Sequence, residues 1–93
     1  MRISKSLIRE GVSEGWQLTI CGTLFRDRKG KTTAFEHEKI LRLCDDIGGS
    51  DSDALYRFLT DRNINHDYIR IFYGVTKNRL FAMKKEFYKR WLD

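Results

Sequence analysis

The side chains with the widest chemical range in this sequence are two cysteines and two histidines. Cys21, His37, Cys44 and His66 all carry zinc-ligating atoms, but no two of them stand at the Cys-x-x-Cys or His-x-x-x-His spacing that closes a zinc site locally. We therefore predict no metal ion and no other cofactor. Both thiols are expected to be reduced and to pack as small hydrophobic side chains, with a Cys21–Cys44 disulfide as the alternative.

Residues suited to acid–base catalysis are equally sparse. Two adjacent pairs stand out, His66 with Asp67 and Asp45 with Asp46. Neighbouring residues on a helix point about 100° apart, so neither pair converges on one substrate atom. Residues 29–32 (Lys-Gly-Lys-Thr) look like the end of a phosphate-binding loop, but that loop needs an earlier glycine where this chain has Phe25. We predict that the protein is not an enzyme and has no catalytic residue.

The elements that position these side chains must come from a chain of 93 residues with 41% hydrophobic residues and a formal charge of +5. This length predicts a single domain, residues 1–93, with one modest core. No uncharged segment is long enough to span a bilayer or to act as a secretory signal, so we expect a cytoplasmic protein with no membrane contact. The basic balance permits a polyanionic partner without requiring one.

The first half of the chain reads as β-structure. Trp16, Leu18 and Ile20 recur at period two, which is typical of a half-buried strand. Residues 27–30 form a charged turn and residues 31–35 return as a second strand. Residues 1–14 form either a short helix after Ser4 or an extra strand. The expected fold class is α+β, with an N-terminal β-hairpin packed against three to four helices, the last one long and amphipathic.

Helical spacing of apolar residues in the second half predicts residues 36–47, residues 52–62, a short helix opening at Asn65 or His66, and residues 77–92. The glycines at 48, 49 and 74 supply stops. Residues 51–53 (Asp-Ser-Asp) and Thr76 supply caps. These periods predict the core residues Trp16, Leu18, Ile20, Ile40, Leu55, Phe58, Leu59, Leu80, Phe87 and Trp91.

The last predicted helix has an apolar face and a basic face. A helical wheel places Leu80, Met83, Phe87 and Trp91 together. The opposite side carries Asn78, Ala82, Lys85 and Lys89, with Arg79 and Arg90 flanking. Such a face is either solvated surface or a contact for a polyanion.

Residues 66–92 resemble a helix-turn-helix, because a short helix, Gly74, Val75, Thr76 and a second helix follow in the order of that motif. The resemblance implies that Gly74 makes the turn, that Val75 and Leu80 are core, and that the second helix points its first exposed side chains at base edges. The implied contacts are Lys77, Asn78, Arg79, Ala82 and Lys85, with Lys84, Lys85 and Lys89 suited to phosphates. Where the motif wants a small residue, four positions before the glycine, this chain has Arg70.

The predicted hairpin turn carries a second basic group, Arg26, Arg28, Lys29 and Lys31. Arg28 and Lys29 are the expected contacts to a phosphate backbone, in the manner of a β-wing beside a recognition helix. A solvated turn is the alternative.

Together these features predict a small nucleic-acid-binding or regulatory protein whose contact segment is residues 66–92 and whose partner is DNA or another nucleic acid. The competing prediction is a protein-interaction module, or a homodimer, that uses the same aromatic and basic last helix without catalysis. Loss of affinity for random DNA as salt rises favours the first prediction, and salt-insensitive self-association favours the second. The target, the oligomeric state and the biological process are not specified by the sequence.

Overall fold

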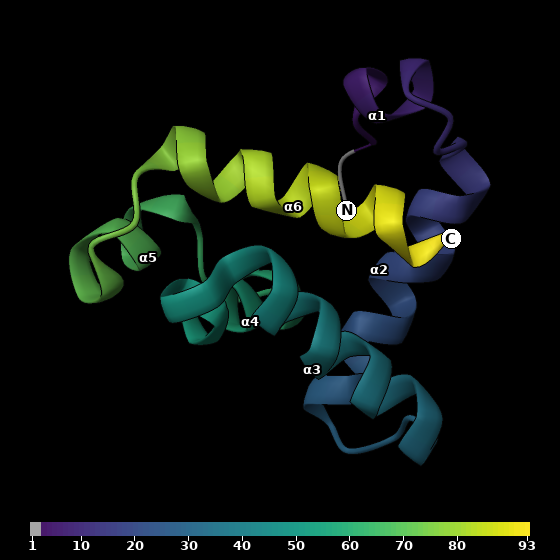
Figure 1. Cartoon of the computed structure of the whole chain (residues 1–93), viewed down its shortest axis with the longest axis horizontal. Coiled ribbons are helices and arrows are strands. Elements are labelled where there is room, and N and C mark those ends of the chain that lie inside the picture. Colours follow the sequence, from purple (N-terminus) through teal and green to yellow (C-terminus); the bar gives the residue numbers. More distant parts are fainter. Residues whose placement is uncertain (1–2) are drawn as a thin grey trace.

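A computed structural model describes residues 3–93, and every regular element in that range is helical (Figure 1). The elements are α1 (Lys5–Arg9), α2 (Glu14–Arg28), α3 (Ala34–Gly48), the 3-10 turn η1 (Gly49–Asp51), α4 (Ser52–Thr60), α5 (His66–Tyr73) and α6 (Lys77–Trp91). Residues 3–93 contain no strand, so the predicted α+β class is wrong and the fold is all-helical.

The predicted β-hairpin is replaced by α2 and the loop that leads to α3. Trp16 and Leu18, which alternate as strand residues should, are 49% and 50% exposed. The buried residues of α2 recur instead at helical spacing: Gln17, Ile20, Cys21, Thr23, Leu24 and Asp27. Polar residues fill half of these buried positions, so hydrophobicity alone does not reveal the helical period. The hairpin prediction failed for that reason.

Gln17 occupies a buried position because its amide satisfies backbone groups at the corner between α1 and α2. The side-chain oxygen accepts a hydrogen bond from the Ser4 backbone N–H at 2.9 Å. The side-chain nitrogen donates to the carbonyls of Ser4 at 3.0 Å and Val12 at 3.1 Å. Of the two possibilities for residues 1–14, the helix after Ser4 is therefore the correct one, although residues 1 and 2 lie outside the described range.

Asp27 ends the buried face of α2, and its side chain has no exposed surface. It accepts hydrogen bonds from the hydroxyls of Thr32 at 2.5 Å and Tyr56 at 2.7 Å, and its carboxylate lies 2.9 Å from Nδ1 of His37. Burial alone raises the pKa of Asp27, but the hydrogen bonds from Thr32, Tyr56 and His37 outweigh it and hold the pKa below its usual value. This cluster joins the end of α2 to α3 and α4.

The second half of the chain follows the sequence prediction closely. Thr33 and Glu36 form a reciprocal capping box, so α3 starts two residues before the predicted position. Asn65 caps α5, Gly74 ends it, and Thr76 caps α6. One cap differs from the prediction, because Asp51 stands at the N-cap of α4 without making a side-chain cap hydrogen bond.

Helix α6 is the central element of the fold. It runs across the molecule and packs against α1, α2, α3, α4 and α5 (Figure 1). Six predicted core residues are buried, namely Ile20, Ile40, Leu55, Leu59, Leu80 and Phe87. Phe58 and Trp91 are partly buried against this core, whereas Trp16 and Leu18 are exposed and that part of the prediction was wrong. Cys21 and Cys44 are both buried free thiols, as expected of small core residues.

Candidate functional site

The turn between α5 and α6 has the local structure that the helix-turn-helix resemblance implied. Gly74 has φ 73° and ψ 16°, the left-handed conformation that favours glycine. Val75 is buried in the core, and the Thr76 hydroxyl accepts the Arg79 backbone N–H at 3.3 Å. Leu80 is fully buried one turn later. These contacts fix the direction in which α6 leaves the turn.

The first turn of α6 is exposed and contains no acidic residue. Lys77 and Asn78 make no side-chain hydrogen bond or ion pair with any other residue in the range 3–93. Arg79 differs, because its Nε lies 2.9 Å from Oδ2 of Asp51 and its Nη2 donates to the Gly48 carbonyl at 3.4 Å. The predicted base-edge residues therefore lie together, and two of them are free to meet a ligand.

The second half of the predicted basic face forms ion pairs with the end of α1. Glu10, at the end of α1, pairs with Lys85 at 2.8 Å and with Lys89 at 3.3 Å. The hydrogen bond from Lys85 is the main reason that the pKa of Glu10 lies below its usual value. Two predicted phosphate contacts therefore share one carboxylate of the same chain, and α1 lies beside the C-terminal half of α6 (Figure 1).

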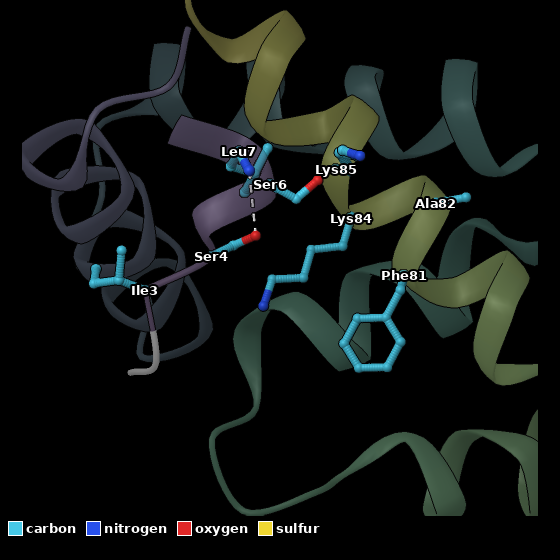
Figure 2. Close-up of a pocket in the computed structure, with 8 residues that line it drawn as sticks. All are labelled: Ile3, Ser4, Ser6, Leu7, Phe81, Ala82, Lys84 and Lys85. Carbon is cyan, nitrogen blue, oxygen red and sulfur yellow. Dashed lines mark hydrogen bonds between the residues drawn. The ribbon is translucent and has the colours of Figure 1, made fainter. Parts of the chain in front are cut away.

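Lys84, the remaining predicted phosphate contact on α6, is mostly inside the molecule. A groove of about 500 Å³ separates α1 from α6, and Figure 2 shows the Lys84 side chain extending from α6 toward the start of α1. The ammonium lies 5.9 Å from the ring of Phe58 and 5.7 Å from that of Tyr88, and burial lowers the pKa of Lys84. Lys84 is therefore less accessible than Lys77 and Asn78, which are exposed.

Arg28 and Lys29 lie at the end of α2, away from the α5–α6 turn. No hairpin forms in this region, so the predicted β-wing is wrong, and the basic residues belong to a helix end and a helix–helix loop. Arg28 lies 3.6 Å from Asp61, which also accepts a hydrogen bond from Arg57 at 3.0 Å. Lys29 is exposed.

Arg57 of this pair also lies against the ring of Tyr68 on α5, and that ring packs against Phe72 of the same helix. This arrangement was not predicted from the sequence. The guanidinium of Arg57 lies 5.4 Å from the ring centre of Tyr68, and the rings of Tyr68 and Phe72 are 4.5 Å apart. The four-residue spacing of Tyr68 and Phe72 on a predicted helix was an available signal. The position of Arg57 on a different helix was not.

Arg70 stands where the helix-turn-helix motif has a small residue, yet α5 and α6 still pack against each other. The Arg70 side chain is exposed and lies 3.8 Å from Asp67. Ile69 supplies the buried contact of α5, and His66 packs near Phe81 with ring centres 5.9 Å apart. A large residue is therefore tolerated at the position where the motif has a small one.

Neither a metal site nor a membrane segment is found in the described part of the chain. Residues 3–93 contain no group of three or more metal-ligating side chains. Within the same range, no helix is both long and apolar enough to cross a bilayer. No protein-family model, curated protein or solved structure matches this chain. The exposed side chains around the α5–α6 turn are the features of this chain that bear on its function.

Proposed function

We propose that the protein binds nucleic acid through the corner formed by α5, the Gly74–Thr76 turn and the first turn of α6. The observation that carries this proposal is the exposure of Lys77 and Asn78, without partners among residues 3–93, on a helix whose start is fixed by Gly74, Val75 and Thr76. A lysine suits a phosphate, and an asparagine amide suits the edge of adenine.

Long-range charge supports the same partner. The chain carries a formal charge of +5, which favours approach to a polyanion. Because Lys85 and Lys89 already pair with Glu10, the proposed contact centres on the start of α6. Helices that read nucleic acid commonly do so with their N-terminal residues.

Fluorescence-anisotropy titration against labelled oligonucleotides at about 50 and 200 mM salt tests the proposal. Lys77→Ala should weaken binding to all sequences and lower the salt slope by about one. Lys5→Ala, which removes an exposed lysine from α1, is the matched control and should change affinity less than Lys77→Ala. Asn78→Ala should act mainly on a preferred sequence.

Two results contradict this function. Absence of binding at low salt with micromolar protein overturns it, because non-specific electrostatic contacts already register under those conditions. Equal losses of nucleic-acid affinity in Lys77→Ala and Lys5→Ala would mean that the nucleic acid binds elsewhere on the molecule.

A second candidate function is a protein-interaction module, and one observation favours it. Ile71 and Phe72 are 65% and 67% exposed at the end of α5, which is unusual for adjacent large apolar residues. Tyr88, near the far end of α6, is buried, so this surface would use α5 instead. Salt-insensitive self-association by light scattering that is lost in Ile71→Ser supports this candidate.

A further inference from the structure

The exposed ring of Phe72 ends a preorganised stack. Tyr68 and Phe72 lie one helical turn apart on α5, with ring centres 4.5 Å apart and planes inclined by 34°. Arg57, on α4, covers Tyr68 at 5.4 Å. In this arginine–aromatic stack (Arg57, Tyr68 and Phe72), no ring of residues 3–93 other than Tyr68 packs against Phe72, which is 67% exposed.

Positive charge lies at both ends of the stack. At one end, Arg57 and Arg28 share the single carboxylate of Asp61, at 3.0 and 3.6 Å, so the cluster has an excess of one positive charge. Lys29, next to Arg28, is exposed. At the other end, Phe72 stands two residues before Gly74, and the three-residue turn leads directly to Lys77 and the start of α6.

A stack of this kind suits an unpaired base. Every base has a π-face that adds to an aromatic ring, and the phosphates on either side of that base need cations. A base inside a duplex is stacked between its two neighbours and has no free face for an aromatic ring. Binding of a duplex would therefore leave Phe72 exposed. The ion pairs of Lys85 and Lys89 with Glu10 also reduce the positive charge that the second half of α6 offers to a duplex.

We infer that the nucleic acid bound at this corner is single-stranded, with a base stacked on Phe72, an adjacent phosphate near Lys77, and the strand continuing over further nucleotides toward Arg57 and Arg28. This inference rests on the proposed function and specifies its substrate class. A purely apolar protein partner would cover Phe72 but leave the excess charge of the arginine pair without a counterpart.

Anisotropy titrations with a single strand of about 20 nucleotides and with a duplex of the same sequence test the inference. We expect wild-type protein to bind the single strand more tightly. Phe72→Ala should weaken single-strand binding by about 5- to 100-fold, the loss of one stacked base, and leave duplex binding unchanged. Phe35→Ala removes a 75% exposed ring at the start of α3 and should leave both affinities unchanged.

Phe72→Trp adds a direct readout of stacking. The larger ring should retain the affinity of wild-type protein, and the additional tryptophan emission should be quenched by the single strand but not by the duplex. A ring with a merely structural role would give no quenching that depends on strandedness.

The possible outcomes separate the inference from the proposed function. Tight duplex binding that is sensitive to Lys77→Ala and insensitive to Phe72→Ala overturns the inference and leaves the proposed function standing. Single-strand binding that Phe72→Ala and Phe35→Ala affect equally overturns this location for the base. Lack of binding to any nucleic acid overturns both, and self-association that depends on Phe72 assigns the surface to a protein contact.

Discussion

Removal of the Tyr56 hydroxyl should destabilise the fold by about 2 kcal/mol. In Tyr56→Phe the buried carboxylate of Asp27 loses the donor that lies 2.7 Å from its Oδ2. Hydrogen bonds to charged groups contribute about 1.5 to 3 kcal/mol, and a distance of 2.7 Å is typical of the charge-assisted kind. The Asp27 side chain has no exposed surface, so water cannot replace the lost donor. Thr32 and His37 still donate to or contact the carboxylate. We therefore expect a loss of stability near the middle of the range of about 1.5 to 3 kcal/mol.

Urea unfolding followed by circular dichroism measures this loss. For a domain of this size the same change corresponds to a fall of about 10 °C in Tm. Tyr68→Phe is the matched control, because its hydroxyl makes no hydrogen bond within residues 3–93. We expect that control to lie within about 0.5 kcal/mol of wild type. Equal unfolding midpoints for the two variants would refute the role assigned to Asp27.

The pH dependence adds a second check on the same cluster. Burial and the bond to Asp27 raise the pKa of Tyr56 to about 12, so the hydroxyl is a donor at neutral pH. The pKa of Asp27 is lowered in the folded state. The ionised Asp27 carboxylate therefore stabilises the fold fully above the ordinary pKa of a carboxyl group, and this stabilisation is lost as the pH falls through the folded-state pKa. The difference between wild type and Tyr56→Phe should therefore shrink in acid. A difference that stays constant down to acid unfolding contradicts an ionised acceptor.

Four further substitutions test the helical assignment of α2, the α5–α6 turn and the corner between α1 and α2. Ile20→Ala should cost about 2 to 5 kcal/mol and Leu18→Ala less than about 0.5 kcal/mol in urea unfolding, whereas a strand would give similar losses at both positions. Gly74→Ala should lower stability by about 1 to 2 kcal/mol in thermal unfolding, because its φ of 73° strains any side chain even though no atom crowds the position; an unchanged Tm contradicts this. Gln17→Ala leaves backbone groups of Ser4 and Val12 without partners and should speed amide exchange in residues 4–12 by about 10-fold or more; wild-type protection would contradict the proposed corner.

The second half of the fold was predictable because caps and apolar periods agree there. Thr76, Gly74 and Leu80 each have one local role that their residue types already favour. In α2, by contrast, burial of Gln17 and Asp27 depends on hydrogen-bond partners that only the folded chain supplies. A local pattern cannot anticipate such partners, and the exposed Trp16 and Leu18 imitate a strand.

Some features of the candidate site were likewise predictable from local sequence, and others depend on how distant parts of the chain pack. Exposure of Lys77 and Asn78 followed from their position after a capped helix start. The pairing of Lys85 and Lys89 with Glu10 did not, because the carboxylate comes from the opposite end of the chain. The Arg57–Tyr68 contact likewise depends on how α4 and α5 pack. Charge counts along one helix therefore overestimate the cations available to a ligand.

The central position of α6 also has a consequence for how the protein is made. A ribosome completes residues 3–76 before it begins α6, yet α1 to α5 all pack against that helix. Until then Ile20, Ile40 and Leu55 lack part of the surface that buries them in the finished core. The nascent chain therefore passes through a stage with part of its apolar surface open to solvent, and the core closes only after the helix that carries Lys77 and Asn78 has been made and released from the ribosome.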